Sequence, residues 1–454
     1  MAQQHATHMT EGVIWKQIVK FALPVFLGNL FQQLYNVTDS LIVGNFIDDK
    51  GALGAVTTSG SLIFLLVGLF QGIFIGAGVV IARYWGAKEE AKVHRAVHTT
   101  IFFATIAGII LTVVGVLFTP TILGWMDTPK DVLPHSITYF RIYFSGAIFS
   151  VLYNASTGVF QAVGDSRHPL YYLIVSSVIN VVLDLLFVAV FGWKVAGAAF
   201  ATIIAQAISA FLSLHKLTRS VGAFRLIPTQ IRPDIPLLKE ILRLGIPSGV
   251  QNAIISFANI IVQFSINGFE VDATTGCGVY SKIEGFAFLP ITAFSMALTT
   301  FIGQNLGARE YARARKGARF GVLTCALMAE IIGLLIYLLI PHLIGFFNDD
   351  PMVIHFGTIH AQVTTLFYFL LAYSHAMAGV LRGAGKSIIP MIVMMICWCL
   401  IRVTYVLVMV PIVHELTTVS WAYPLTWTLS SICFTVYYFK ADWVHAYDRK
   451  ATKA

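Results

Sequence analysis

Residues 158–169 read Gly158-Val-Phe-Gln-Ala-Val-Gly-Asp-Ser-Arg-His-Pro169, and residues 379–390 read Gly379-Val-Leu-Arg-Gly-Ala-Gly-Lys-Ser-Ile-Ile-Pro390. The two stretches lie 221 positions apart and share glycine, serine and proline at matching places. The same offset relates Gly86-Ala-Lys-Glu-Glu-Ala91 to Gly307-Ala-Arg-Glu-Tyr-Ala312. The sequence therefore predicts two related halves, each of which repeats one arrangement of spans and loops.

The composition shows which class of protein these halves form. Of 454 residues, 30 are Lys or Arg and 22 are Asp or Glu, so only 11% are charged, against about 25% in ordinary soluble domains. Apolar residues make up 57%, and the mean hydropathy is +0.78. So few charges could not cover a water-soluble surface, which excludes soluble enzymes, disordered scaffolds and secreted disulfide frameworks. The composition predicts an all-α polytopic membrane protein.

Apolar windows of about 20 residues or more predict twelve transmembrane helices. Six spans in each half is an even number, so both halves enter the membrane in the same direction. Two six-helix bundles should then be related by a pseudo-two-fold axis along the membrane normal. We expect an N-terminal lobe at 1–217, a cytoplasmic linker at 218–238 and a C-terminal lobe at 239–454. The predicted spans are 18–45, 55–82, 97–118, 136–162, 169–191, 196–217, 240–268, 280–304, 320–341, 355–381, 390–411 and 418–438.

The basic residues predict the orientation of these spans. If the N-terminus lies in the cytoplasm, 24 of the 30 Lys and Arg residues fall in cytoplasmic segments and four fall on the outer side. This positive-inside bias predicts a multi-pass protein of the cytoplasmic membrane with both termini in the cytoplasm. The net charge of +8 then reflects topology, so no nucleic-acid partner is expected.

A charge at bilayer depth costs about 2.5–3.5 kcal/mol on insertion scales, so each one needs a reason. Asp39 lies in the first predicted span, and the same helix face carries Gln32, Tyr35 and Asn36. This polar stripe should face the interior of the bundle, where Asp39 either binds a cation or serves as a hydrogen-bonded packing residue. Pro24, earlier in the span, is a candidate hinge or a passive bend.

Asp184 is the second carboxylate at bilayer depth. Asn180 precedes it by about one turn on the fifth span, and Thr202 and Gln206 form a polar pair on the sixth. Carboxylate, amide and hydroxyl oxygens suit Na⁺, whereas a desolvated carboxylate suits a proton. Thr202 and Gln206 could instead supply hydrogen bonds between helices. The sequence leaves H⁺ and Na⁺ open.

The second half lacks these two acids. Along the repeat, Val262 and Tyr405 occupy the positions equivalent to the two aspartates. The first span of this half instead has an uncharged polar face that includes Asn252 and Asn259. Titratable chemistry is therefore expected in the first half. The candidate substrate contacts are Gln32, Tyr35, Gln206, Asn252 and Asn259.

Three charged residues of the second half have no role assigned by this pattern. Glu330 and Arg402 fall inside predicted spans, where they pair either with each other or with backbone groups. Glu284 is expected near the outer boundary of the membrane. For Glu330 and Arg402 a structural role is the first interpretation.

These features together resemble the MATE (multidrug and toxic compound extrusion) family. The resemblance is carried by Pro24 and Asp39 in the first span, Asn180 and Asp184 in the fifth, and the repeated glycine-rich loops. It covers nearly the whole chain and is greatest to the DinF-like and MepA-like branch. It implies two six-helix lobes and a secondary antiporter that exports cationic amphipathic compounds in exchange for H⁺ or Na⁺.

The resemblance also implies a cation site in the N-terminal lobe. The residues that match this site in the branch are Asp39, Asn180, Asp184 and Thr202, with Asn36 one turn from Asp39. Na⁺ bound there would be the coupling ion, and no other metal or cofactor is expected. The NorM-like branch uses a glutamate in its seventh span, but residues 251–258 contain no acid. A cation site of that type in the C-terminal lobe is therefore not expected.

We predict a multidrug efflux antiporter that confers antibiotic resistance and works by alternating access as a monomer. Its partners would be small organic cations, H⁺ or Na⁺, and the lipid bilayer. A flippase for lipid-linked precursors is the first alternative, disfavoured because the spans contain little Lys or Arg. An intramembrane enzyme is the second, disfavoured because no metalloprotease or phosphate-loop motif is present.

Overall fold

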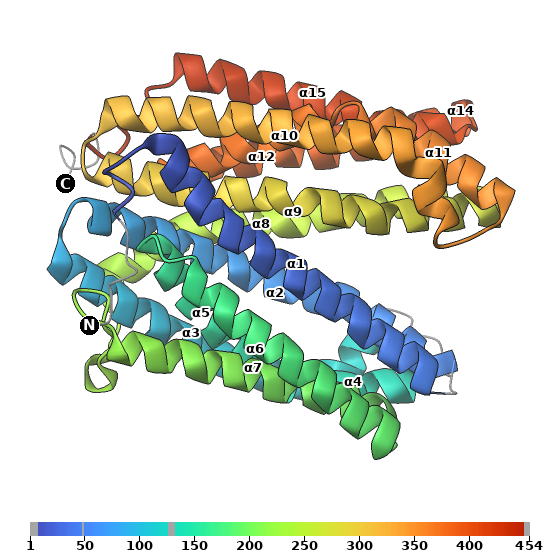
Figure 1. Cartoon of the computed structure of the whole chain (residues 1–454), viewed down its shortest axis with the longest axis horizontal. Helices are drawn as coiled ribbons and strands as arrows, with labels where there is room; N and C mark the ends of the chain where they lie inside the picture. Colours follow the sequence, from blue (N-terminus) through green and yellow to red (C-terminus); the bar gives the residue numbers. More distant parts are fainter. Residues whose placement is uncertain (1–7, 48–49, 126–131, 449–454) are drawn as a thin grey trace. The chain divides into compact units, whose positions relative to one another are not determined.

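The computed structural model of the chain describes residues 8–47, 50–125 and 132–448, and the regular elements in these ranges are helical (Figure 1). The first half contains α1 (Ile14–Phe46), α2 (Lys50–Gly86), α3 (Glu90–Trp125), α4 (Leu133–Ser145), α5 (Ala147–Ala162), α6 (Arg167–Asp184), the π-helix η1 (Leu185–Val190) and α7 (Lys194–Arg219). The short 3₁₀-helix η2 (Pro228–Gln230) follows. The second half contains α8 (Ile235–Ile266), α9 (Val271–Gly307), α10 (Tyr311–Gly345), α11 (Pro351–Thr365), α12 (Tyr368–Gly383), α13 (Ile388–Met394), the π-helix η3 (Met395–Ile401), α14 (Arg402–Ile412) and α15 (Leu416–Lys440).

The helices confirm the prediction of an all-α membrane protein. By length and composition, eight of the described helices can cross a membrane, or nine if α11 and α12 form one span broken by a bend of 53°. Each of the twelve predicted spans overlaps one helix or a run of consecutive helices. Twelve crossings stay a prediction. The termini at 1–7 and 449–454, which were predicted to be cytoplasmic, lie outside the described residues.

The repeat is visible in the backbone of the loops. Lys88 and Arg309, 221 positions apart, both adopt the left-handed conformation, with φ of 58° and 61°. In each loop the next residue caps the C-terminal end of the preceding helix. Glu89 N–H donates to the Tyr84 carbonyl at 3.0 Å, and Glu310 N–H donates to the Asn305 carbonyl at 2.8 Å. This is the hydrogen-bond pattern of a Schellman motif. The matching sequence segments therefore build matching helix ends.

The quoted glycine-rich loops also match. Gly164 and Gly385 have φ of 83° and 70°, which glycine adopts without the steric cost of a Cβ atom. In each half one predicted span is broken at the same place. Gly146 separates α4 from α5, and Phe367, 221 positions later, lies between α11 and α12. Two halves with the same turns and the same broken helix are the structural basis of the sequence repeat.

The contacts divide the chain into two compact units. Unit 1 comprises Met1–His8 and Leu27–Ile246, and unit 2 comprises Met9–Phe26 and Pro247–Ala454. In unit 1, α5 packs against α2, α3 and α7, and α6 packs against α7 (Figure 1). In unit 2, α9 packs against α10, α11 and α12, and α15 packs against α11 and α12. The division by contacts falls inside α1 and α8. The lobe limits predicted from the sequence, at residues 217 and 239, stay predictions.

The first part of α1 belongs to unit 2. Ile18 and Phe21 are buried in the apolar core of that unit. The backbone before α1 is also fixed there, because Met9 N–H donates to Gln304 Oε1 at 2.8 Å. Arg313 donates to the carbonyl groups of Glu11 and Gly12 at 2.9 and 2.7 Å. The helix passes to unit 1 at Leu27, three residues after Pro24.

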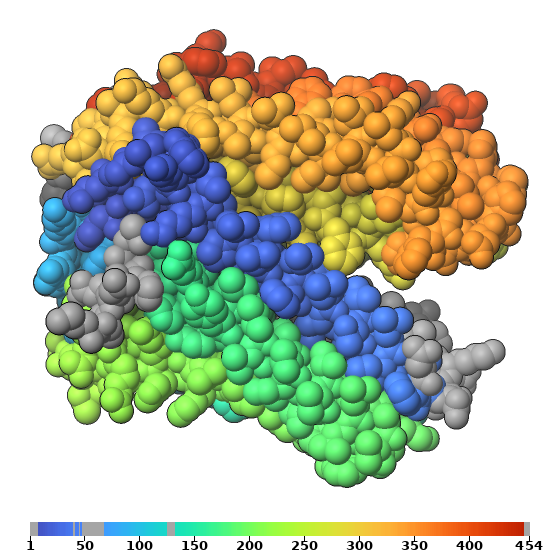
Figure 2. All heavy atoms as spheres, in the orientation of Figure 1, coloured from blue at the N-terminus to red at the C-terminus, as the bar shows by residue number. Residues whose placement is uncertain are grey.

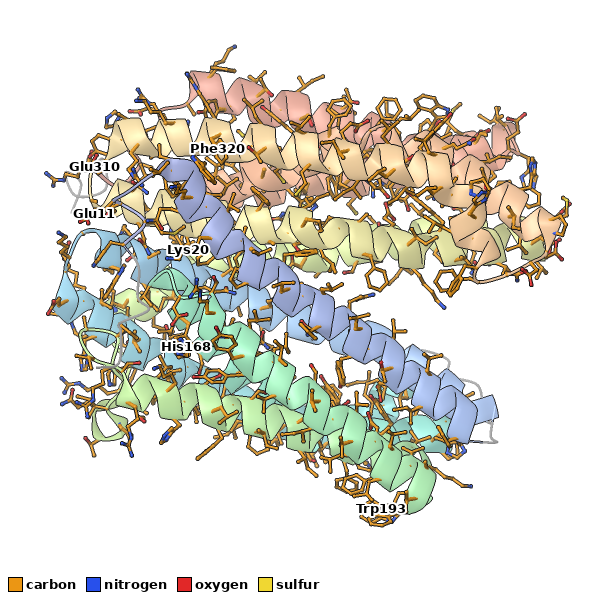
Figure 3. All side chains as sticks on the ribbon, viewed as in Figure 1. Glu11, Lys20, His168, Trp193, Glu310 and Phe320 are labelled. Carbon is orange, nitrogen blue, oxygen red and sulfur yellow. The ribbon has the colours of Figure 1, made fainter. Side chains whose placement is uncertain are left out.

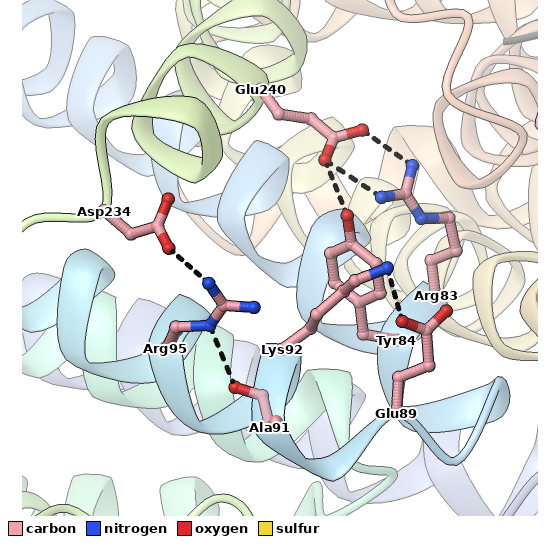
Figure 4. A network of polar contacts seen from close by, with 8 residues as sticks. All are labelled: Arg83, Tyr84, Glu89, Ala91, Lys92, Arg95, Asp234 and Glu240. Atoms are coloured by element: carbon pink, nitrogen blue, oxygen red, sulfur yellow. Dashed lines mark hydrogen bonds and ion pairs between the residues drawn. The ribbon is translucent and has the colours of Figure 1, made fainter. Parts of the chain in front are cut away.

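The first part of α8 belongs to unit 1, where ion pairs attach it (Figure 4). Arg83 on α2 forms a bidentate pair with Glu240 on α8, at 2.6 and 2.9 Å, and Tyr84 donates to the same carboxylate at 3.2 Å. Arg95 on α3 pairs with Asp234 at 3.1 Å. The helix passes to unit 2 at Pro247, so in both halves the change of unit falls near the repeated proline.

The outer faces of several helices suit a lipid environment. Leu323, Leu327, Ile331, Leu334 and Leu338 form a stripe along α10, and each is at least 50% exposed. Figure 2 shows α10 at the surface of unit 2. In unit 1, Trp193 stacks on Phe187 at 4.9 Å and lies at the end of the unit near the η1–α7 turn (Figure 3). Exposed aromatic clusters of this kind are typical of a membrane interface.

Candidate cation-binding site

Asp39 on α1 and Asp184 at the end of α6 come together inside unit 1. Asp39 is 8% exposed and Asp184 is 0% exposed. The two carboxyl groups interact with each other. Even so, Oδ1 of Asp39 and both oxygens of Asp184 have no hydrogen-bond partner of good geometry in the described part of the chain. Two acids that were 145 positions apart in the sequence therefore form one buried acidic pair.

Asn180 lies one turn before Asp184 and is also fully buried. Neither its amide oxygen nor its amide nitrogen has a hydrogen-bond partner among the described residues. An unpaired buried amide usually costs about 1–3 kcal/mol, so a packing role explains it poorly. Immediately after Asp184 the helix widens into the π-helix η1, a feature that often occurs at functional sites. The π-helix and the unpaired side chains thus both indicate a functional site at the end of α6.

Thr202 on α7 joins this group through Tyr35. The Tyr35 hydroxyl donates to Thr202 Oγ1 at 3.4 Å, and Thr202 Oγ1 donates to the Ala198 carbonyl at 2.9 Å. The Tyr35 side chain also interacts electrostatically with both aspartates. The structure therefore brings Asp39, Asn180, Asp184 and Thr202 into one unit, while their roles stay predictions.

Two tyrosines of α4 were missed in the sequence analysis: Tyr139, which borders the acidic pair, and Tyr143, which stacks on Tyr139. Tyr139 is 6% exposed and interacts electrostatically with both aspartates. Its ring stacks on Tyr143, with centroids 6.3 Å apart, and the Tyr143 hydroxyl interacts with Gln206. The signal that could have found them is two hydroxyl-bearing rings four residues apart within the fourth predicted span.

The predicted polar stripe of α1 divides between two environments. Asp39 is buried and Tyr35 half-buried, whereas Gln32 and Asn36 are exposed. The stripe is wide enough for one edge to enter unit 1 while the other edge remains at its surface. Of the remaining candidate substrate contacts, Gln206 is half-buried in unit 1, and Asn252 (half-buried) and Asn259 (exposed) belong to unit 2.

The charged residues of the second half find partners that the sequence left open. Glu330 accepts a hydrogen bond from the Phe369 N–H at 3.0 Å, at the break between α11 and α12. Arg402 interacts electrostatically with Glu284, which lies thirteen residues into α9. At a rise of about 1.5 Å per residue this is about 20 Å from the start of the helix, well inside it. The position of Glu284 relative to the membrane boundary stays a prediction.

The unit 1 group is chemically suited to a monovalent cation. It offers two carboxylates, an amide and a hydroxyl, which are hard oxygen donors. Among the described residues, no three or more His, Cys, Asp or Glu side chains are arranged so that they could hold a metal ion. Oxygen donors of this kind suit hard cations, whereas soft thiolate ligands suit transition metals.

The sequence repeat has a counterpart among known proteins. The family model MatE matches residues 24–186 and matches again at residues 247–408. The two matches begin at Pro24 and Pro247 and together cover more than half of the chain. The chain belongs to the MATE family. Two tandem matches also account for the two halves that the sequence repeat predicted.

Individual MATE relatives agree with this assignment. The chain is 29% identical to the probable multidrug resistance protein YoeA of Bacillus subtilis, over 84% of this chain and 83% of the relative. It is 20% identical to the multidrug export protein MepA of Staphylococcus saprophyticus, over 85% of each. A solved structure, the outward-facing conformation of a multidrug resistance MATE family transporter of the MOP superfamily, aligns with a TM-score of 0.87 at 20% identity. That alignment covers 96% of this chain and 98% of the solved one.

The MATE assignment decides between classes of function. The relatives are multidrug transporters, so this MATE chain is a multi-pass membrane transporter and not an enzyme. The solved structure shares the fold, which confirms the all-α architecture. The coupling ion and the substrates of this MATE chain are matters for the proposal that follows.

Proposed function

We propose that this MATE protein exports cationic amphipathic compounds in exchange for inward H⁺ or Na⁺ by alternating access. The observation that carries the proposal is the buried pair Asp39 and Asp184, with the unpaired amide of Asn180 beside it. Negative charge in an apolar interior is costly unless a cation neutralises it. A site of this kind binds either the coupling ion or a cationic substrate.

Competition for the same charge would make the exchange obligatory. When H⁺ or Na⁺ occupies Asp39 and Asp184, a cationic compound loses its electrostatic attraction and leaves. When the ion departs toward the cytoplasm, the carboxylates attract the next compound. Tyr35 and Tyr139, which border the acids, offer flat aromatic faces to an organic cation, and Tyr143 stacks on Tyr139.

Two forms of coupling fit the donor set. For Na⁺, the ligands would be Asp39, Asn180, Asp184 and Thr202, whose oxygens satisfy a hard cation. For H⁺, one proton would be shared by the two interacting carboxyl groups. Pro24 would then act as the hinge of α1, since it lies three residues from the change of unit.

The membrane placement is part of the proposal. The excess of Lys and Arg in the predicted cytoplasmic segments supports a cytoplasmic membrane protein with both termini inside the cell. One chain contains both related units, so a monomer suffices for alternating access.

The test is transport by purified protein in proteoliposomes, with pH and Na⁺ gradients imposed separately and ethidium as substrate. We expect uptake or release driven by one of the two gradients. Transport driven by Na⁺ alone would remove the proton-linked hinge. Absence of dye transport under both gradients, together with movement of a fluorescent lipid-linked precursor, would favour the flippase alternative and contradict the proposal.

A further inference from the structure

The start of α10 in unit 2 carries a basic group made of Arg315, Lys316 and Arg319. All three side chains are exposed, and the helix is one of those able to cross a membrane. None of the three forms an ion pair within the described residues. The acid that precedes the helix, Glu310, interacts with Arg313 instead. Three positive charges at the end of a membrane helix are therefore left without a counter-charge in this part of the chain.

The matching positions in unit 1, 221 residues earlier, are covered by the segment at 227–234 (Figure 4). Arg95 on α3 pairs with Asp234 at 3.1 Å. The ring of His98 accepts a hydrogen bond at Nε2 from the Ile227 N–H at 3.0 Å. Unit 1 thus satisfies these positions with its own chain. The residues that correspond in units 1 and 2 are His94 and Arg315, Arg95 and Lys316, and His98 and Arg319.

In unit 2 the segment that follows α15 holds the corresponding place in the sequence. Its two acids have other contacts, because Asp442 interacts with His445 at 2.8 Å and Asp448 accepts a hydrogen bond from Tyr311 at 2.6 Å. Residues 449–454 contain three basic residues and no acid. Residues 441–448 therefore do not give the basic group the counter-charge that Asp234 gives Arg95.

An aromatic cluster at the end of α15 borders the basic group. Tyr438 interacts electrostatically with both Arg315 and Arg319, so the end of α15 lies beside the start of α10 (Figure 1). The Tyr438 ring lies against Trp443, with centroids 5.3 Å apart, and the neighbouring Phe439 is 74% exposed. Aromatic side chains of this kind are enriched at the level of lipid headgroups.

An apolar stripe continues the same helix face away from the basic group. Leu323 and Leu327 follow Arg319 at intervals of four residues, and they are 68% and 64% exposed. At about 1.5 Å per residue, they lie about 6 and 12 Å further along the helix axis. The face therefore presents cations first and an apolar surface next. A soluble anion or an acidic peptide would use only the cations, whereas a lipid uses both.

We propose that the basic group of α10 is a binding site for an anionic glycerophospholipid. The lipid phosphate accepts hydrogen bonds from Arg315 and Arg319, which lie one turn apart, and Lys316 adds positive charge beside them. The acyl chains lie along Leu323 and Leu327. The lipid comes from the leaflet at which α10 begins, which the distribution of basic residues predicts to be the cytoplasmic one. In unit 2 the lipid would supply the negative charge that unit 1 takes from Asp234.

The test is native mass spectrometry of the purified full chain, titrated with phosphatidylglycerol and with phosphatidylcholine of the same acyl chains. The readout is the ratio of the two apparent affinities, which is independent of transport. Each basic residue near a lipid headgroup contributes about fivefold in affinity, so wild-type protein should prefer phosphatidylglycerol at least tenfold. Arg315→Gln combined with Arg319→Gln should reduce this preference to about threefold or less.

Two control variants separate the site from general surface charge. Arg319→Lys retains the positive charge and should keep the preference within about twofold of wild type. Arg167→Gln removes an exposed arginine at the start of α6 that has no other Lys or Arg within four residues, and it should also keep the preference. Because Arg319 interacts with Tyr438, Arg315→Gln combined with Lys316→Gln gives a second test that leaves this interaction in place.

Three results would overturn the inference. The first is equal affinity of wild-type protein for the two lipids. The second is a wild-type preference in the folded double variants. The third is displacement of phosphatidylglycerol by glycerol 3-phosphate, which has the charged headgroup without the acyl chains and would assign the site to a free phosphate.

Discussion

Asp184 and Asn180 are the residues whose environment most needs a ligand. Both are fully buried, and their polar atoms lack hydrogen-bond partners of good geometry among the described residues. In a soluble core such groups are normally paired, and each unpaired group costs about 1–3 kcal/mol. We attribute this cost to function, since a bound cation would satisfy the same oxygens.

Asp39→Asn and Asp184→Asn should each reduce ethidium efflux at least tenfold, which corresponds to an increase of about 1.4 kcal/mol in the activation free energy of transport. The substitutions preserve size and remove the charge that the ion and the substrate share. Efflux from cells that express each variant at wild-type levels measures the effect. Glu415→Gln removes an exposed acid and is the control. Wild-type efflux by the Asp39→Asn protein would contradict the assignment.

Thr202→Val should raise the half-saturating concentration of the coupling ion about tenfold, because a hydroxyl ligand is replaced by a methyl group of similar volume. Thr202→Ser retains the hydroxyl and should stay within about twofold of wild type. The measurement is dye transport as a function of pH or Na⁺ concentration. Equal behaviour of the two variants would restrict Thr202 to its hydrogen bonds with Tyr35 and Ala198.

At the scale of elements, the first part of α8 is attached to unit 1 by the Arg83–Glu240 pair (Figure 4). The two side chains are 13% and 20% exposed, so solvent screens the pair only in part. Arg83→Gln should lower the free energy of unfolding by about 1–2 kcal/mol, because Glu240 loses its bidentate partner. Lys92→Gln breaks the local i, i+3 pair with Glu89, in which both side chains are 43% exposed, and should cost less than about 0.5 kcal/mol. Equal melting temperatures of the two variants would contradict this difference.

Close packing of glycines holds the same two helices together. A Cβ atom added at Gly245 on α8 would lie 2.6 Å from the Ile73 backbone of α2, and one at Gly76 would lie 2.3 Å from the Gly245 nitrogen. Gly245→Ala should therefore destabilise the protein by about 1–3 kcal/mol through overpacking. At Gly278, on α9, an added Cβ meets nothing within 4 Å. Gly278→Ala should thus leave the melting temperature unchanged or raised, and a similar loss in both variants would contradict the packing argument.

At the scale of the whole molecule, the features that could be predicted from the sequence are those that depend on local patterns of residues. Hydropathy and the repeat at offset 221 predicted an all-α membrane protein of two halves, and the presence of a charge inside a predicted span singled out Asp39 and Asp184 as candidates. What sequence reasoning missed depends on contacts between distant segments. The assignment of residues 9–26 to unit 2 follows from the packing of Ile18 and Phe21, which no local pattern encodes. Tyr139 was missed because only the fold brings α4 to the acidic pair.

The same limit applies to charge pairing. The sequence shows that Glu330 and Arg402 lie at bilayer depth, but partners on other helices are set by the tertiary arrangement. In the structure Glu330 accepts a hydrogen bond from a backbone N–H, and Arg402 interacts electrostatically with Glu284 on α9. The position of Glu330 and Arg402 inside a predicted span therefore could not show which groups they contact.

The central claim is that one acidic pair in unit 1 binds the coupling ion and the substrate in turn. The most direct measurement is ion movement driven by the substrate, in proteoliposomes with no initial ion gradient. An imposed ethidium gradient should drive H⁺ or Na⁺ in the opposite direction in wild-type vesicles, and this counter-movement should be lost with Asp184→Asn. Counter-movement of the ion at the wild-type rate through Asp184→Asn protein would contradict the account.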